Sequence, residues 1–432
     1  MLNNIRKTYK EFPPLFWVVV VTLFIDSIGS TLLFPFFALY ITEKFGVGMT
    51  QAGVLIGMSS LFGIVGSMIG GALTDRFGRR KLILFGLVFS ALSSLLFGLA
   101  SDVNLLYLLV IFVGLLSRLA APAQDAMMAD ILPESKRQEG FGITRVAFNF
   151  AWIFGTALGG LIASQSFFAL FVTDAVLSTL VAVILYFKLP ETRPTNHKEA
   201  KEDETLLTTV ANYRVVLKDS AYMVFIIIGV LSLLIYQQQY SSLPVYLRDV
   251  HNISSQIYGI MLAIAGLEVV LLQYWVSRVI RKYPPFQMMT LGTLFFIGGF
   301  TMIGLSRVVP LILTTEIILT VGGMTVFRFV PLFLAAVAII TVGEMITFPT
   351  NRVIAANFAP ETMRGRYMAV FDLGWTLPAT FGPAAAGIIL DNYNPDLLWY
   401  LGGVMCAVSA LGFYALHIKL GSQARFSPTT EK

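Results

Sequence analysis

Three acidic side chains stand within long apolar runs of this sequence: Asp26 in FIDSIGSTLLFPFF, Glu268 in AIAGLEVVLLQ and Glu344 in ITVGEMITFPTN. Charges at membrane depth are costly, so ionisable residues in such runs mark ion pathways, proton relays or substrate sites. Removal from water disfavours the charged form of a carboxylic acid, so a group that alternately meets water and a dry interior exchanges a proton. These residues therefore predict proton coupling, with Glu344 as the first choice.

A basic residue, Arg118, lies in a further apolar run, VGLLSRLAAP. Arginine does not release its own proton, but its fixed charge favours the ionised form of a neighbouring carboxylate. We expect Arg118 to pair with Asp26 and to tune it. Asp174, in FVTDAVLS, is a weaker candidate because we expect it nearer the outer surface.

The composition places these runs in a membrane. The 432 residues are 56% hydrophobic and 13% charged, whereas soluble domains carry about 25% charged residues. Cys406 is the only cysteine and the three histidines are far apart in the chain, so disulfides within the chain are excluded and a metal site is not expected. The sequence contains no nucleotide-binding loop or catalytic constellation, so we expect neither an enzyme nor a cofactor, and the net charge of +5 is not a nucleic-acid signal.

The apolar runs predict an all-α integral membrane protein. A crossing needs about 20 apolar residues. Twelve runs of this kind are expected at residues 15–41, 51–74, 82–100, 105–129, 141–163, 167–187, 221–247, 256–277, 286–305, 330–356, 367–390 and 397–419.

The chain divides into two six-helix halves, residues 1–187 and 221–432, joined by a polar linker at 188–220. An offset of 227 residues aligns Pro122 with Pro349 and Arg137 with Arg364 without a gap. Parallel six-helix repeats of this kind transport solutes by rocking about a site near the bilayer midplane.

A short tandem duplication interrupts the second half. VPLILTTEIILTVGGM, residues 309–324, is followed by VPLFLAAVAIITVGEM, residues 330–345, with nine of sixteen positions identical. A thirteenth crossing here would invert all that follows and place Arg364 and Arg366 outside, against the positive-inside rule. We therefore expect the insert near 305–329 to form an outer hairpin, an interfacial helix or a prolongation of span nine; a thirteenth span is the less favoured alternative.

The distribution of positive charge predicts the orientation. With both termini, the linker and loops 2/3, 4/5, 8/9 and 10/11 on one side, that side collects 23 of the 30 Lys and Arg residues. Because cytoplasmic loops retain positive charge, both termini are predicted to be cytoplasmic, in a multi-pass protein of the cell's inner membrane.

One charged stretch, GGALTDRFGRRK at residues 70–81, carries a recognisable pattern. It resembles the loop 2/3 signature of the major facilitator superfamily, and the repeat extends the resemblance over nearly the whole chain. The resemblance implies a cytoplasmic gate that latches the outward-facing state. The expected gate residues are Gly71, Asp75, Arg76, Gly78 and Arg79 of this stretch, together with Asp130 and Arg137 of loop 4/5.

Two further segments resemble proton-driven multidrug efflux antiporters of that superfamily. GEMITFPTN resembles their tenth helix, where an acidic residue takes part in cation binding or coupling. GTALGG, residues 155–160, resembles their antiporter signature with Thr156 in place of proline, and its small residues suit close helix packing.

Aromatic and polar residues are expected to line an apolar cavity suited to amphipathic or cationic compounds. The candidates are Gln238, Gln239, Tyr240, Asn149, Trp152, Asp372 and Trp375. The preferred function is export of lipophilic or cationic small molecules coupled to protons, by a monomer in contact with membrane lipids. The alternatives are an exporter or flippase for amphipathic lipids or lysolipids, a proton-coupled importer, and a non-transporting receptor.

Overall fold

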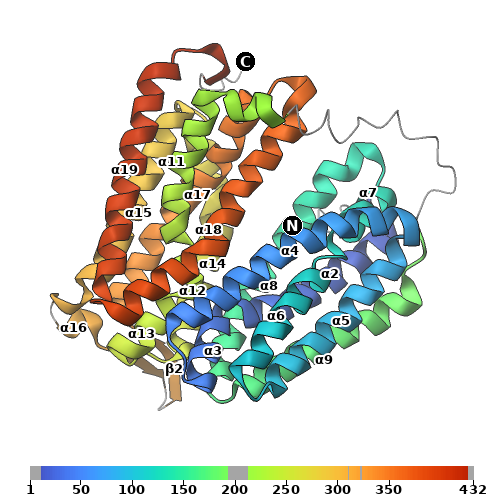
Figure 1. Cartoon of the computed structure of the whole chain (residues 1–432), viewed down its shortest axis with the longest axis horizontal. Helices are drawn as coiled ribbons and strands as arrows, with labels where there is room; N and C mark the ends of the chain where they lie inside the picture. Colours follow the sequence, from blue (N-terminus) through green and yellow to red (C-terminus); the bar gives the residue numbers. More distant parts are fainter. Residues whose placement is uncertain (1–10, 193–212, 310, 322–323, 427–432) are drawn as a thin grey trace. The chain divides into compact units, whose positions relative to one another are not determined.

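A computed structural model describes residues 11–192, 213–309, 311–321 and 324–426. Within these ranges, twelve helices are long and apolar enough to cross a membrane, which confirms the predicted fold class (Figure 1). The twelve spans are Pro14–Phe45, Met49–Gly71, Arg79–Leu99, Val103–Ile131, Glu134–Ala163, Phe167–Lys188, Ser220–Ser241, Ser255–Ile280, Pro285–Arg307, Pro331–Phe358, Arg364–Asn392 and Asp396–Leu420.

The chain packs as two compact units. Unit 1 contains Met1–Gly46 and Leu55–His197, and unit 2 contains Val47–Val54 and Lys198–Lys432. The linker predicted at 188–220 falls largely on residues 193–212, which lie outside the described ranges.

Unit 1 is a bundle of helices, and several of its breaks coincide with proline or glycine, such as those at Pro35, Gly46, Gly78 and Pro122. Its elements are α2 (Pro14–Leu33), η1 (Phe34–Phe36), α3 (Phe37–Phe45), α4 (Met49–Phe77, whose first residues belong to unit 2), α5 (Arg79–Leu99), α6 (Val103–Ser117), α7 (Ala121–Ile131), η2 (Glu134–Lys136), α8 (Arg137–Ala163) and α9 (Phe167–Lys188).

Unit 2 contains a second set of helices and one small hairpin. Its elements are α11 (Ser220–Tyr236), α12 (Gln238–Ser241), α13 (Leu243–His251), α14 (Ser255–Ile280), α15 (Pro285–Gly304), η3 (Leu305–Arg307), α16 (Leu311–Thr314), β1 (Ile317–Val321), β2 (Met324–Phe329), α17 (Pro331–Phe358), η4 (Glu361–Met363), α18 (Arg364–Asn392), α19 (Asp396–Leu420) and η5 (Ala424–Phe426).

The two halves repeat each other at the level of single turns. The 3-10 turn η2 and the helix α8 that follows it correspond to η4 and α18. Both η4 and α18 start 227 residues after their counterparts in the first half. This spacing agrees with the offset read from the sequence.

Three predicted spans are not continuous helices. The first is interrupted by η1, which contains Pro35, and the seventh breaks at Gln237 and again at Ser242, just before Pro244. The fourth breaks between Ser117 and Ala121, because Pro122 has no N–H to offer to the carbonyl of Arg118. Apolar periodicity alone does not reveal these breaks.

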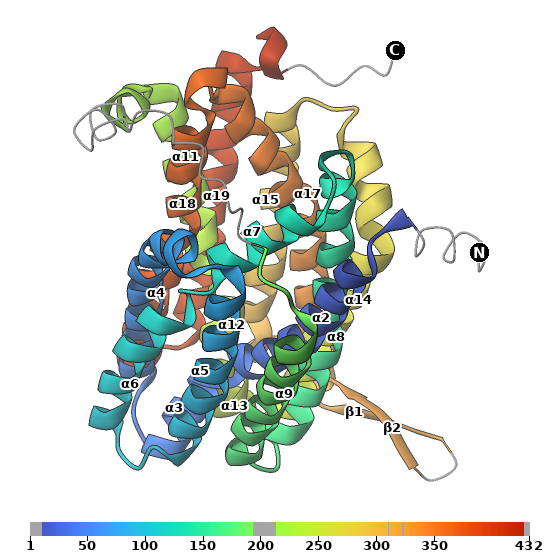
Figure 2. The ribbon, with the colours of Figure 1, turned by 90° about the vertical axis from the view of Figure 1, so that its right-hand side faces the viewer.

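The duplicated insert forms a β-hairpin and not a thirteenth span. Strands β1 and β2 pair antiparallel, with Ile317 opposite Phe329 and Val321 opposite Met324. Figure 2 shows the hairpin projecting away from the helices that flank it in the chain. A hairpin returns the chain to the side it left, so the insert adds no crossing.

Small residues bring α8 of unit 1 against α2. A Cβ atom placed on Gly159 would lie 2.6 Å from the carbonyl oxygen of Leu32 and 2.8 Å from the Phe36 ring, and one on Gly155 would collide with Thr31. These glycines, four residues apart, are those of the GTALGG segment, so the segment works here as a packing surface.

Candidate functional site

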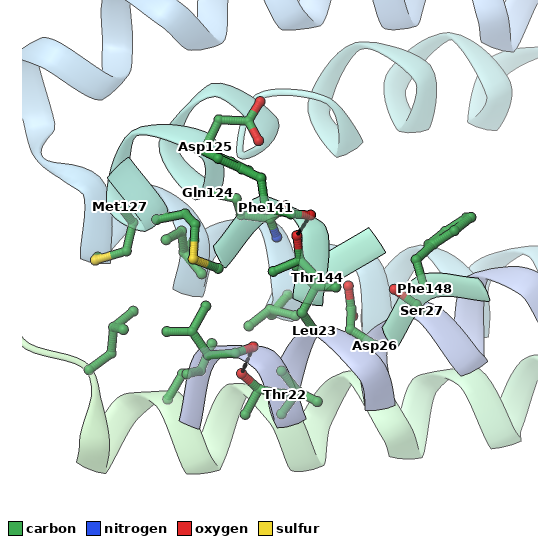
Figure 3. A pocket seen from close by; sticks show the side chains of 17 residues that line it. Thr22, Leu23, Asp26, Ser27, Gln124, Asp125, Met127, Phe141, Thr144 and Phe148 are labelled. Carbon is green, nitrogen blue, oxygen red and sulfur yellow. Dashed lines mark hydrogen bonds between the residues drawn. The ribbon is translucent and has the colours of Figure 1, made fainter. Parts of the chain in front are cut away.

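A pocket of about 240 Å³ lies within unit 1 (Figure 3). Five helices contribute to it: α2, α5, α7, α8 and α9. Figure 3 shows Asp26 rising from α2 and Asp125 standing on α7, so the two carboxylates come from different walls. The pocket thus contains one predicted site residue and one that the sequence analysis did not select.

The pocket has a closed floor and an open mouth. Apolar residues such as Leu87, Met127 and Val181 form the buried part, the last two only 1% exposed. The exposed residues at the other end include Asp125, Phe141 and Phe148. A solute therefore meets aromatic rings and a carboxylate before it reaches the apolar floor.

Asp26 also belongs to a buried group of polar side chains from α2, α5 and α9. Its carboxylate is hydrogen-bonded with Ser178 of α9, and Ser178 Oγ lies 3.4 Å from Ser90 Oγ of α5. One turn away on each of these helices, Ser94 donates to Asp174.

Asp174 is only 3% exposed and approaches α2 at Gly29. Its charge interacts with that of Asp26. The sequence analysis gave Asp174 little weight because it was expected nearer the outer surface. The structure makes it a buried neighbour of Asp26.

Arg118 does not pair with Asp26, so that part of the prediction is wrong for this structure. Arg118 is exposed at the break between α6 and α7, and its Cγ packs near Gly63 of α4. It forms no ion pair with any residue in the described ranges. The pairing assumed that Arg118 lies in a continuous fourth helix. The break caused by Pro122 places Arg118 between α6 and α7.

Unit 2 holds Glu344 in an aromatic environment. The Tyr236 hydroxyl donates to Glu344 Oε2 at 2.8 Å, and the Tyr240 hydroxyl lies 2.8 Å from that of Tyr236. The rings of Phe348 and Tyr236 are 4.9 Å apart between centroids. Glu268 of α14 is close enough for its charge to interact with that of Glu344. Two predicted acids are therefore brought together by α14 and α17.

The predicted cavity residues have different environments. Tyr240 and Trp375 belong to the aromatic group around Tyr236, whose ring is 6.3 Å from that of Trp375. Gln238 is occupied locally, since its amide donates to Leu234 O and accepts from two serine hydroxyls. The backbone of Gln239 accepts from Tyr258.

The other three cavity candidates are less enclosed. Asp372 is exposed, whereas Asn149 and Trp152 of α8 are half-buried. None of the three lines the pocket described above.

The predicted gate residues cluster around the start of α5. Gly78 has a positive φ of 92°, which favours glycine. Arg79 Nε donates to Asp130 Oδ2 at 3.1 Å, which joins two predicted gate residues. The backbone N–H groups of Arg79 and Arg80 donate to the Glu191 carboxylate at 2.9 and 3.3 Å. A carboxylate at a helix N-terminus is favourable because the exposed amides and the helix dipole attract negative charge.

The remaining gate candidates are more peripheral. Gly71 has open space beside it, and Arg76 is exposed beside the Phe77 ring. Arg137 donates to the carbonyl of Ala129. The side chain of Asp75 lies outside the described part of the chain.

A polar network joins α13, η3 and α19 of unit 2. The Tyr246 hydroxyl donates to Asp396 Oδ1 at 2.8 Å, and His251 Nε2 lies 2.9 Å from Ser306 Oγ. Arg307 pairs with the other oxygen of Asp396 at 3.4 Å. Burial lowers the pKa of His251 below its ordinary value of 6.5, against the opposing effect of Asp396.

We expect His251 to make folding sensitive to acid. Because its pKa is lower in the folded protein, the unfolded chain binds more protons below pH 6.5, so stability is retained above that pH and lost as the pH falls below it. The thermal unfolding temperature of wild-type protein should fall more between pH 7.5 and 5.5 than that of His251→Gln. Equal falls in the two proteins would contradict this role.

Sequence reasoning missed Asp125, Glu191 and Tyr236. Asp125 lies in the same segment as Asp130, but only the fold turns it toward a pocket shared with α2. Glu191 follows Pro190 in the polar linker, a sequence signal that was available. Tyr236 precedes the three glutamines that drew attention to this helix.

Comparison with known proteins relates the whole chain to transporters. A model of the Major Facilitator Superfamily matches residues 19–327 and 304–431. The "Na(+), Li(+), K(+)/H(+) antiporter" of Planococcus maritimus is 29% identical over 393 residues, which cover 85% of this chain and 87% of that protein. "Multidrug resistance protein 1" of Bacillus subtilis is 29% identical over 190 residues, covering 44% and 48% of the two chains.

Solved structures with the same fold include a nucleoside transporter. Its crystal structure aligns with 93% of this chain and 99% of its own, with a TM-score of 0.77 and 12% identity. At that identity the likeness concerns the fold alone.

Proposed function

The chain belongs to the major facilitator superfamily, and from this premise we propose that it exports lipophilic organic cations in exchange for protons. The observation that carries the proposal is Glu344, a carboxylate within a membrane span that accepts a hydrogen bond from Tyr236. Such a group exchanges a proton or a cation according to whether water reaches it. Proton uptake from one side then replaces the cation released there.

The aromatic residues around Glu344 support an organic cation as substrate. Tyr236, Phe348 and Trp375 present three rings within 6.3 Å of one another between centroids. Aromatic faces attract cations, and most strongly where water is excluded. A sugar would need many hydrogen-bonding groups, which these rings do not supply.

Exchange of alkali cations for protons is the second candidate. It is favoured by the Planococcus maritimus relative, whose name specifies Na⁺, Li⁺ and K⁺. Carboxylate and hydroxyl oxygens, such as those of Glu344 and Tyr236, also suit a small hard cation. The two candidates share the proton step and differ in the co-transported ion.

Proteoliposomes with an imposed pH gradient test both candidates, the exchange of organic cations and the exchange of alkali cations for protons. We expect ethidium to move against its own gradient and to stop doing so when a protonophore collapses the pH gradient. Parallel measurements of internal pH after addition of NaCl, LiCl or KCl report alkali-ion exchange. Proton flux with the salts but not with ethidium would favour the second candidate, and ethidium flux that survives the protonophore would reject proton coupling.

A further inference from the structure

We propose that the pocket within unit 1 is a binding site for small amphipathic organic cations, with Asp125 at its mouth and Asp26 toward its floor supplying the negative charge. This inference rests on the proposed cation export and adds a second place for its substrate, besides the aromatic group around Glu344. Asp125 is the residue that the proposal adds to the predicted site. The pocket belongs to unit 1 alone.

The charge of the lining selects for cations. Among the 17 described side chains that line the pocket, two are carboxylates and none is Lys, Arg or His. Asp125 forms no ion pair with any residue of the described ranges. A carboxylate left unneutralised beside low-polarity walls attracts a positive ligand and repels a negative one.

The walls select for an apolar body. Leu23, Leu87 and Leu185 face the pocket together with Met127 and Met128. Methionine side chains adapt to ligands of irregular shape. The exposed rings of Phe141 and Phe148 lie at the mouth, where they offer faces to a positive group.

The threonine hydroxyls of the pocket are not arranged for a polyol. Thr22 donates to the carbonyl oxygens of its own helix, at 2.8 Å for Val18, and Thr144 donates to Phe141 O at 2.9 Å. A hydroxyl has one proton to donate, so these threonines have none left for a ligand's acceptors. An ammonium group whose charge is satisfied by carboxylates and rings has no such requirement.

The volume sets the size of the ligand. About 240 Å³ is somewhat below the roughly 300–1,000 Å³ usual for drug-sized ligands. We therefore choose phenyltrimethylammonium, which has one aromatic ring and one quaternary nitrogen, as the probe. Its neutral isostere, tert-butylbenzene, has the same shape with carbon in place of nitrogen.

Equilibrium binding of radiolabelled phenyltrimethylammonium to the purified full chain in nanodiscs tests the site. We expect saturable binding that tert-butylbenzene does not displace at equal concentration. Asp26→Asn should weaken binding by about tenfold or more, and Asp125→Asn by about two- to fivefold because it is exposed. Thr144→Trp, which fills the pocket without changing its charge, should abolish binding.

A matched control separates the pocket from charge in general. Asp102→Asn makes the same chemical change in the same unit, outside the pocket. Asp102 caps α6 by accepting from the N–H groups of Asn104 and Leu105, and asparagine caps as well as aspartate. This variant should bind like wild type.

The outcomes distinguish this site from the proposed function. Binding by Thr144→Trp and Asp125→Asn equal to wild type, in protein of normal elution profile, would overturn the pocket even if gradient-driven transport were intact. Displacement by the neutral isostere would overturn the requirement for charge. Pocket-dependent binding without gradient-driven flux would keep the site and reject proton-coupled export.

Discussion

Glu344→Gln removes gradient-driven transport while the protein still folds. The glutamine keeps the size of the side chain and the acceptor for the Tyr236 hydroxyl, but it binds and releases no proton. An imposed pH gradient then has no group in this span through which to act, so ethidium accumulation should fall to the level of empty vesicles. Exchange of labelled for unlabelled ethidium, which needs no net proton movement, should continue.

The measurement compares gradient-driven accumulation and ethidium exchange in the same proteoliposomes. Tyr236→Phe retains the Glu344 carboxylate and removes its hydrogen-bond donor. A hydrogen bond to a charged group contributes roughly 1.5–3 kcal/mol, so we expect gradient-driven ethidium transport to decrease by about tenfold or more. Glu361→Gln, an exposed change in η4 of the same unit, serves as the control and should transport normally. Full gradient-driven accumulation by Glu344→Gln would remove Glu344 from the coupling step.

Gly159→Ala should destabilise unit 1 although it adds a single methyl group. The new Cβ would lie 2.6 Å from Leu32 O and 3.1 Å from Leu32 Cα, so α8 and α2 must separate. Backbone atoms give way less readily than the end of a flexible side chain, and overpacking of this kind costs about 1–3 kcal/mol. We expect a lower unfolding temperature and a lower yield of monodisperse protein.

Gly142→Ala on the same helix is the matched control. A Cβ at Gly142 has no neighbour within 4 Å, and alanine favours a helix over glycine by about 0.8–1 kcal/mol. This variant should be as stable as wild type or more so, when both are followed by thermal unfolding in detergent. A Gly159→Ala protein that unfolds at or above the wild-type temperature would contradict close packing of the two helices.

The sequence predicts much of the fold because membrane crossings depend on composition over long windows. Twelve apolar runs and an offset of 227 residues were enough to predict twelve spans in two repeats. The sequence also favoured an insert that adds no crossing, because a thirteenth span would place Arg364 and Arg366 outside. These inferences rest on hydropathy and charge summed over many residues, so a single polar residue or helix break does not change them.

The site was predicted less completely because it depends on local breaks and on contacts between distant segments. Pro122 and the interruption at Arg118 separate α6 from α7, and this removed the expected partner of Asp26. Asp125 became visible only when α7 and α2 were seen to line one pocket. Glu344 was recognisable from its own apolar run, but its donor Tyr236 lies 108 residues away in the chain.

The two copies of the duplicated segment adopt different secondary structures. Ile318-Leu-Thr-Val lies in strand β1, whereas its near-identical copy Ile339-Ile-Thr-Val lies in the middle of α17. Nearly the same peptide is thus a strand in one setting and a helix in the other, so a duplicated apolar segment need not add a membrane span. The gene could thereby lengthen without reversing the orientation of the three membrane spans encoded downstream.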